Sequence, residues 1–381
     1  MRAIPIGARP PFPDATASIV GQRLANPVVM LFAALLYRPR VLACQMRLRL
    51  LVLCLVCSCA TRFGAVGFAT AWDGAVGNDC VDVSDRNVTL HDVYLSGHNI
   101  HSVTSETLAG FKHAGKLYLH ANRIQTIEKG AFQHLPWLTA LFVCYNPMQS
   151  VEPRAFDGLS SLIVLCLDNN RIRTIQNASF IGLPSLTALS LHGNVIWEIP
   201  RHAFHYMPSL RILRLSNNPI KWIENGAFKG LSALTLLDMS NNQIRSIHKG
   251  FLDGLSSLAK LNLDNNRIEF LFPGAFVGLA SLTELRLESN QIQSIGRDDF
   301  TGLTSLVALR LSNNQIATIE RGAFAGLASL TTLVLEGNPV CRSLFARMLA
   351  FPFTADVRNL PGHAFIWSNY VFQARESGMR L

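Results

Sequence analysis

The sequence predicts a solenoid of the α/β repeat class. This is a curved horseshoe with a parallel β-sheet on its concave face and a mostly irregular or short helical convex side. Two observations carry this prediction. Asparagine recurs every 24 residues, and each one ends the phrase Leu-x-x-Leu-x-Leu-x-x-Asn with occasional apolar substitutions. These ladder asparagines are Asn122, Asn146, Asn170, Asn194, Asn218, Asn242, Asn266, Asn290, Asn314 and Asn338.

Each repeat is expected to contain one short strand followed by a turn. The Leu-x-Leu alternation, as in Leu213 to Leu215, has the period of two of a strand with one buried face. Each strand should pair in parallel with that of the next repeat, about 4.8 Å away. The ladder Asn has both a donor and an acceptor, so it can satisfy backbone groups of neighbouring turns. A Phe usually follows ten residues after it, which predicts an aromatic spine in the core.

The repeats are predicted to extend over residues 90–338. Counting 24 residues back from Asn122 reaches His98, and Val93, Leu95 and Ile100 keep the apolar pattern around it. We therefore predict eleven repeats, with His98 replacing the asparagine of the first. A terminal repeat has only one neighbour, so a departure from the pattern is expected there.

The region before the repeats is predicted to be a leader. Residues 46–71 have a basic start, an apolar run from Leu50 to Cys57 and small residues after it, which is the anatomy of a secretory signal peptide. We expect Met46 to be the true start, with residues 1–45 an upstream leader that is disordered or artefactual. The alternative is a genuine Arg-rich, acid-poor leader resembling a transit peptide. The apolar run is too short to span a bilayer, so no transmembrane segment is predicted.

The basic charge belongs mainly to this leader. Of the formal net charge of +9, residues 1–71 contribute eight Arg and one acidic residue, Asp14, which leaves 26 basic and 24 acidic residues in the remainder. Because the repeats show no basic stripe with interleaved aromatic residues, we do not expect nucleic-acid binding. Sequons at Asn87 and Asn177 agree with secretion and are the predicted glycosylation sites.

The ends of the solenoid need covering, because an exposed edge strand invites association. Residues 72–89 are predicted to form the N-terminal cap, and residues 339–381 a degenerate C-terminal cap. Four cysteines lie outside the leader: Cys80, Cys144, Cys166 and Cys341. From strand spacing, the diagonal pair Cys144 and Cys166 is expected about 8 Å apart, beyond comfortable bridging. For the single cysteine in each cap, free thiols, an intermolecular bridge and a misassembled reading frame stay open.

Residues 90–338 resemble the 24-residue leucine-rich repeats of secreted and cell-surface proteins, such as Toll-type receptor ectodomains and slit-like and chondroadherin-like proteins. The resemblance rests on the ladder phrase, for example Leu210-Arg211-Ile212-Leu213-Arg214-Leu215-Ser216-Asn217-Asn218. It implies a curved solenoid that binds proteins on its concave face. Extracellular relatives usually close each end with several disulfide-bonded cysteines, and the single cysteine in each cap departs from that pattern.

Side chains six, four and two residues before each ladder Asn should line the concave face. Tyr94, Tyr118 and Phe142 would then form an aromatic strip on adjacent strands. Further along lie Ile212, Arg214 and Leu236, of which the two aliphatic residues belong to an exposed apolar band. These six are the predicted partner contacts, because aromatic residues and Arg are enriched where binding energy concentrates. The alternative is that the aromatic rings only stabilise the sheet by cross-strand stacking.

One column on this face could suggest metal chemistry. His120, Cys144, Asp168 and His192 stand two residues before successive ladder asparagines. The outer two would lie on the order of 14 Å apart, so one tetrahedral site using all four is strained. An open sheet also lacks the water exclusion and oxyanion hole that a Cys-His hydrolase needs. We therefore predict no metal, no cofactor and no enzyme activity.

The predicted function is recognition of a protein or glycoprotein partner by a secreted, extracellular solenoid. Two other functions are compatible with the sequence. One is a matrix protein that self-associates into homo-oligomers, and the other is the truncated ectodomain of a signalling receptor. The identity of the ligand is not encoded in the repeat pattern.

Overall fold

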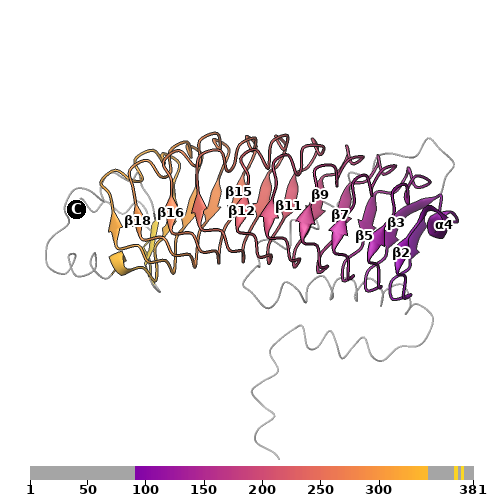
Figure 1. Ribbon diagram of the computed structural model, residues 1–381. Coiled ribbons are helices and arrows are strands. Elements are labelled where there is room, and N and C mark those ends of the chain that lie inside the picture. Colours follow the sequence, from indigo (N-terminus) through magenta and orange to yellow (C-terminus); the bar gives the residue numbers. More distant parts are fainter. Residues whose placement is uncertain (1–90, 342–363, 368–369, 373–381) are drawn as a thin grey trace, which may run out of the picture. The chain divides into compact units, whose positions relative to one another are not determined.

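The computed structural model describes residues 91–341, 364–367 and 370–372. The predictions for the leader, for the cap at residues 72–89 and for Asn87 and Cys80 therefore lie outside the described residues. Within them the chain winds as a solenoid, with successive strands side by side along its length (Figure 1).

The large sheet takes one strand from every turn of the solenoid. Its repeat strands, in spatial order, are β1 (His91–Tyr94), β3 (Ala114–Tyr118), β5 (Ala140–Phe142), β7 (Val164–Cys166), β9 (Ala188–Ser190), β11 (Ile212–Arg214), β13 (Leu236–Asp238), β15 (Lys260–Asn262), β17 (Glu284–Arg286), β19 (Ala308–Arg310) and β21 (Thr332–Val334). Neighbours pair in parallel and in register, for example Leu213 with Leu237, 24 residues on. Two further strands, β22 (Ala364–Trp367) and β23 (Tyr370–Phe372), extend the sheet, the first parallel to β21 and the second antiparallel to β22.

A second set of very short strands follows the ladder asparagines. They are β2 (Ser102–Val103), β4 (Thr126–Ile127), β6 (Ser150–Val151), β8 (Thr174–Ile175), β10 (Glu198–Ile199), β12 (Trp222–Ile223), β14 (Ser246–Ile247), β16 (Phe270–Leu271), β18 (Ser294–Ile295) and β20 (Thr318–Ile319). They join pairwise into two-stranded parallel sheets, such as β10 with β12. We call the outward surface of these strands, together with the residue directly before each of them, the flank.

A single helical turn, α4 (Ser105–Leu108), occurs in the first repeat. The hydroxyl of Thr104 accepts a bond from the backbone of Thr107, whose own hydroxyl accepts one from the backbone of Thr104. This reciprocal capping satisfies two donors that a helix start would leave open. The remaining described repeats return through turns, which agrees with the predicted irregular convex side.

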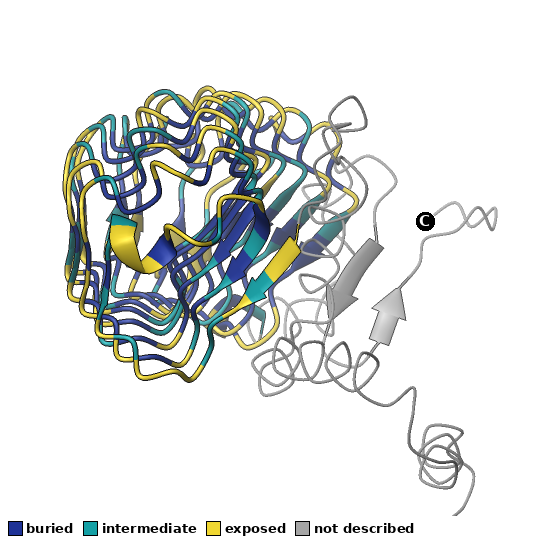
Figure 2. Cartoon of the chain, turned by 90° about the vertical axis from the view of Figure 1, so that its right-hand side faces the viewer, coloured by how far each residue is buried: buried dark blue, intermediate teal, exposed yellow. Residues whose placement is uncertain are grey.

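The core fills the inside of the solenoid. Leucines of the large sheet and isoleucines of the short strands are almost fully buried, apart from the partly buried Ile319. The outer turns carry many of the exposed residues (Figure 2). The predicted aromatic spine is present, because Phe132, Phe156, Phe180, Phe204 and Phe228 stack with ring centroids 6.0–6.2 Å apart. Leu252 interrupts the spine, which resumes from Phe276 to Phe324.

The asparagine side chains tie each turn to the one before it. Asn218 donates from Nδ2 to the carbonyl of Leu191 in the preceding turn, 3.0 Å, and to that of Leu215, 3.1 Å. Its Oδ1 accepts the N–H of Ile196, 3.0 Å. The other ladder asparagines repeat these bonds, apart from Asn170, whose buried Oδ1 has no partner among the described residues. Each side chain thus satisfies backbone groups that would otherwise be buried unpaired.

Candidate functional site

The outward face of the large sheet carries a column of paired residues. It begins Tyr94, Tyr118, Phe142, Cys166 and Ser190, one residue on each successive strand. It continues through Arg214, Asp238, Asn262, Arg286, Arg310 and Val334. The register is strictly parallel, so side chains in this column stand beside one another at the strand spacing.

The three aromatic residues at the start of the column form a continuous stack. The rings of Tyr94 and Tyr118 lie 4.7 Å apart and 7° from parallel, and those of Tyr118 and Phe142 lie 4.9 Å apart and 6° from parallel. Tyr94 is 48% exposed, while the other two are half-buried. Burial and the nearby Asp92 raise the pKa of Tyr118 to about 12, so its phenol stays protonated and can donate a hydrogen bond.

The remaining predicted contacts lie several strands away and are less accessible. Ile212 is half-buried, and Leu236 is buried, so the apolar band is not exposed as the alternation predicted. A side chain on an inner strand has a paired neighbour on either side, and these neighbours cover much of a short aliphatic group. Arg214 lies near Asp168 and Asp238, whose charges oppose the lowering of its pKa by burial.

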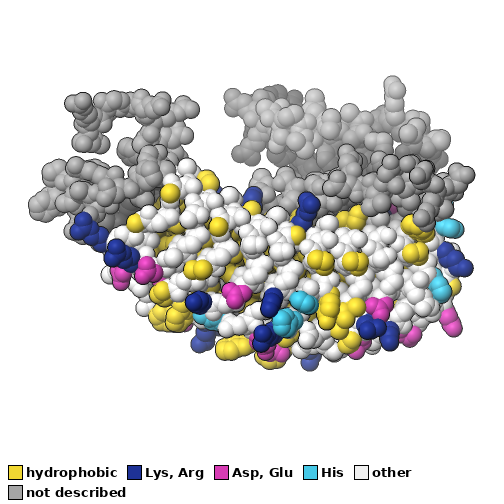
Figure 3. All heavy atoms as spheres, turned by 90° about the horizontal axis from the view of Figure 1, so that it is seen from above, with side chains coloured by type: hydrophobic (Ala, Val, Ile, Leu, Met, Phe, Trp, Pro, Cys, Tyr) yellow, Lys and Arg dark blue, Asp and Glu magenta, His cyan; other side chains and the backbone are white. Residues whose placement is uncertain are grey.

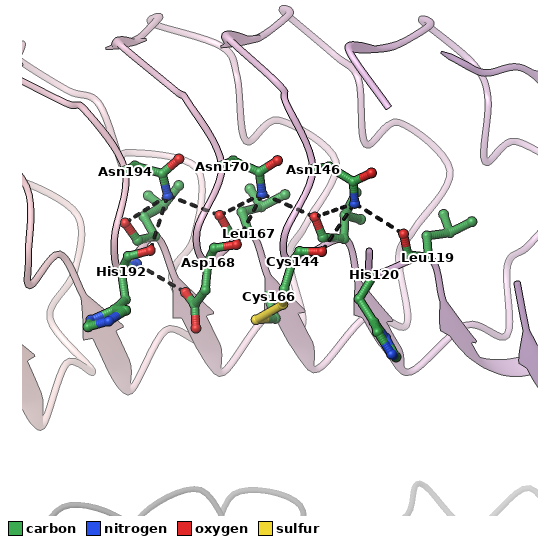
Figure 4. Close-up of a disulfide and its surroundings, with 12 residues drawn as sticks. Leu119, His120, Cys144, Asn146, Cys166, Leu167, Asp168, Asn170, His192 and Asn194 are labelled. Atoms are coloured by element: carbon green, nitrogen blue, oxygen red, sulfur yellow. Dashed lines mark hydrogen bonds between the residues drawn. A yellow bond between two sulfur atoms is a disulfide. The ribbon is translucent and has the colours of Figure 1, made fainter. Parts of the chain in front are cut away.

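A disulfide joins Cys144 to Cys166, which corrects the expectation that this pair is too far apart. Their Cα atoms are 6.0 Å apart, within the usual range for a disulfide. The expectation was wrong because it applied flat-sheet spacing to both residues. Cys166 belongs to β7, but Cys144 lies beyond the end of β5, where the chain starts to turn and approaches the next strand (Figure 4).

The predicted column of metal-ligand types is not assembled as four converging groups. The donor atoms of Cys144, Cys166 and Asp168 all lie within 4.8 Å of one another, but both sulfurs belong to the disulfide. The ring of His120 bonds to Ser96 (3.1 Å) and that of His192 to Ser216 (2.9 Å). Asp168 accepts the backbone N–H of His192, 3.0 Å, and burial raises the pKa of its carboxyl. The closeness of Cys166 to this column was missed because Cys166 occupies the adjacent column.

The C-terminal half of the same face carries a network of charges. Arg286 donates from Nε to the buried carboxylate of Asp264 at 2.7 Å, and the backbone N–H of Glu288 donates to the same carboxylate at 2.7 Å. The guanidinium Nε of Arg310 lies 3.9 Å from Oε1 of Glu284, and its Nη1 lies 3.9 Å from Oε1 of Glu288. Burial outweighs these favourable contacts and raises the pKa of Asp264 to about 6. Because these charges pair with one another, this half of the face carries little net field.

The second sequon lies on an exposed loop of the return side. Asn177 is exposed, so its amide is open to a glycan. Ser179, the third residue of the sequon, is fully buried, and its hydroxyl donates to the carbonyl of Val151 at 2.7 Å. The same hydroxyl accepts the N–H of Gln176, 3.1 Å. Ser179 therefore has a structural role in addition to its place in the sequon.

Outside the sheet face, the surface is mixed. Figure 3 shows one side of the solenoid, on which hydrophobic side chains form separate groups among polar surface, with charged side chains of both signs nearby. No helix among the described residues has the length and apolar character to cross a membrane.

Comparison with known proteins identifies the repeat. The leucine rich repeat family matches residues 88–148, 137–196, 193–244, 237–292 and 281–340. No curated protein matches the chain.

Three solved structures illustrate the shared fold. One, of a TLR13–ssRNA13 complex, is 26% identical with a TM-score of 0.53 and covers 62% of this chain and 42% of that one. A second, of the Drosophila Toll–Spatzle complex, is 23% identical with a TM-score of 0.57, and the match covers 70% of this chain and 39% of that one. The third, an octameric complex of Latrophilin 3, Unc5D and the leucine-rich repeats of FLRT2, is 23% identical with a TM-score of 0.58 and covers 72% and 82%. The chain thus spans less than half of the first two chains.

Proposed function

Because the chain belongs to the leucine-rich-repeat family, we propose that it is a secreted or cell-surface binding module, and not an enzyme. Its partner is a protein or glycoprotein, recognised on the outward face of the large sheet. A solenoid presents an extended surface and no enclosed catalytic cavity, which suits recognition of a macromolecule. The observation that carries the proposal is the stack of Tyr94, Tyr118 and Phe142 on that face.

The stack has the properties of a binding anchor. Its rings are held parallel by a rigid sheet, so little side-chain freedom is lost when a partner covers them. Tyr94 is nearly half exposed, and the protonated hydroxyl of Tyr118 adds a directional donor. Aromatic side chains with a polar tip are enriched among the residues that dominate protein interfaces. Arg214, with Ile212 beside it, gives a second contact further along the face.

Two of the solved structures with this fold are of complexes with proteins. Toll was determined with Spatzle, and FLRT2 with Latrophilin 3 and Unc5D. These complexes support a protein partner over a small molecule for the present chain. The TLR13 structure holds single-stranded RNA, and the near balance of charge in residues 72–381 favours a protein over RNA here.

The contact assignment is tested with a double substitution, Tyr118→Ala with Phe142→Ala. Purified protein is incubated with live cells, and bound protein is measured by flow cytometry before and after the cells are treated with trypsin. We expect trypsin-sensitive binding that the double variant loses by at least about tenfold, since each anchor contributes 1–2 kcal/mol or more. Its melting temperature should stay close to that of the wild type.

A control is Phe272→Ala, which removes an exposed aromatic residue outside the large sheet. This variant should bind cells normally. A double variant that binds as well as the wild type would refute the contact assignment, and one that fails to fold would show that the stack is structural.

Secretion is tested by expressing the full reading frame in cells and determining the intact mass and N-terminal sequence of protein recovered from the medium. We expect a start near Ala60 or Trp72 and glycan on Asn87 or Asn177. Retention inside the cell with an unprocessed N-terminus would overturn the extracellular proposal.

A further inference from the structure

The flank of the solenoid, away from the large sheet, carries large exposed aromatic side chains. Trp222 is 64% exposed, Phe270 56% and Trp197 47%. Trp222 and Phe270 each begin a two-residue strand whose second residue points into the core, so their outward direction is set by the strand. Burying a tryptophan stabilises an interface by several kcal/mol, so exposed aromatic residues grouped on one surface indicate an interaction site.

These residues follow the solenoid register. Glu198 of β10 pairs with Trp222 of β12, and Ser246 of β14 pairs with Phe270 of β16. The residues directly before these strands are likewise spaced 24 residues apart and form a column of their own. Backbone bonds join two of its steps, because the N–H of Lys221 donates to the carbonyl of Trp197 and the N–H of Glu269 donates to the carbonyl of Arg245. The column reads Arg173, Trp197, Lys221, Arg245, Glu269, one residue per turn. Four of the five are exposed, and Glu269 is half-buried.

The charged side chains of this column are left unpaired by the part of the chain that the structure describes. Arg173, Lys221, Arg245 and Glu269 form no ion pair there. This contrasts with Arg286 and Arg310 on the large sheet, which pair with carboxylates. Their order has a particular symmetry about the turn that holds Lys221 and Trp222. Arg173 lies two turns to one side and Glu269 two turns to the other, while Trp197 and Arg245 each lie one turn away.

We propose that this flank is the interface of a homodimer in which two copies pack antiparallel about a two-fold axis passing beside Trp222. Such an axis places each residue of the column opposite a residue of the second copy that lies the same number of turns from Lys221 in the other direction. Arg173 then meets Glu269 of the second copy, Trp197 meets Arg245 in a cation–π contact, and Trp222 packs against Trp222. Lys221 of one chain then lies opposite Lys221 of the other. Glu198 on the adjacent turn places a carboxylate close to these two cations.

A second copy fits this flank better than a polyanion does. A surface that binds a polyanion would carry cations alone, whereas this surface also carries the carboxylates of Glu198 and Glu269. The two ends of the column, Arg173 and Glu269, have opposite charges, so each end is complementary to the other end of a second copy. An aromatic centre with a charged rim of both signs is the composition of a protein interface. Closed two-fold dimers are also the commonest soluble assemblies, and they require a self-complementary patch of this kind.

The test is a charge exchange within one chain, measured by sedimentation velocity from about 1 to 100 μM, the range in which interfaces of modest size dissociate. The wild type should dimerise with increasing concentration. Arg173→Glu should raise the dimer dissociation constant by at least about tenfold, because it places a glutamate opposite Glu269 and the two-fold axis makes this repulsive pair occur two times in each dimer. Glu269→Arg alone should do the same. The double variant R173E with E269R should return to within about threefold of the wild type, since the pair is only reversed.

Two controls separate this interface from other surfaces. Arg123→Glu makes the same charge change at an exposed position two repeats earlier, outside this column, and should leave dimerisation unchanged. The Tyr118→Ala, Phe142→Ala variant should also dimerise normally, so failure of the proposed partner site and failure of this interface are distinguishable. Melting temperatures verify that each variant is folded.

Three results would overturn the proposal. The first is a wild type that stays monomeric at the highest concentration. If the wild type is monomeric, adding heparin tests the other occupant of the flank. A shift in tryptophan fluorescence that the Trp222→Phe variant does not show would indicate that the flank binds a sulfated polysaccharide instead. The second is a dimer that Arg173→Glu and Glu269→Arg leave intact. The third is a double variant that folds but dimerises no better than the single ones, which would refute the two-fold register.

Discussion

The residue before each ladder asparagine has a left-handed backbone. Asn217, Asn241 and Asn265 all have φ of 55°, and Tyr145 occupies the same position with φ of 56°. Asn tolerates this conformation because its short side chain can bond locally, whereas a bulky L-residue is strained there. Tyr145 is 49% exposed, so it gains little from burial to offset this strain.

We therefore expect Tyr145→Asn to raise the free energy of unfolding by about 0.5–1 kcal/mol, measured by urea denaturation. The reverse substitution at the matching position, Asn241→Tyr, should lower it by a similar amount. Equal stabilities for all three proteins would show that Tyr145 is not strained.

The carboxyl of Asp264 makes stability depend on pH in an unusual direction. Its folded pKa of about 6 lies above the unfolded value of about 3.9, so the folded state binds the proton more tightly. The protein should lose stability as pH rises from about 4 to 6, by at most about 3 kcal/mol from this group. Asp264→Asn should remove this part of the slope when unfolding is measured across the range. A wild-type and variant difference that does not change with pH would contradict the prediction.

At the scale of elements, the disulfide fastens strand β7 to the turn that follows β5. It spans a sequence separation of 22 residues, and closing such a loop stabilises the folded state by roughly 3 kcal/mol through the entropy of the unfolded chain. We expect the Cys144→Ser, Cys166→Ser variant to lose about this much stability in urea denaturation, and reductant to have no further effect on it.

The free Cys341 gives the control for this experiment. Cys341→Ala removes the thiol that bonds to the carbonyl of Leu335, yet reductant should still destabilise this variant as it does the wild type. Wild-type protein that is equally stable with and without reductant would show that the bridge does not form.

At the scale of the whole molecule, each turn contacts mainly its neighbours, so stability should vary along the solenoid. Phe204 is fully buried in the middle of the spine, and Phe324 is half-buried at its end. Phe204→Ala should lower the free energy of unfolding by about 3–5 kcal/mol, and Phe324→Ala by about half as much.

Hydrogen exchange adds the spatial test. In the Phe204→Ala variant, amides of the adjacent turns should exchange faster than those at either end of the described repeats. A uniform increase along the chain would indicate that the solenoid unfolds as one cooperative unit.

The sequence by itself determined the solenoid, the register of its strands and the spine of Phe132 to Phe324, because a period of 24 residues places equivalent residues side by side in every turn. The stack of Tyr94, Tyr118 and Phe142 followed from the same counting. Only the tertiary structure decided the bridge between Cys144 and Cys166, the burial of Leu236 and the shared flank of Trp197 and Trp222. These depend on how the chain turns beyond a strand and on which side chains cover one another, and a linear period specifies neither.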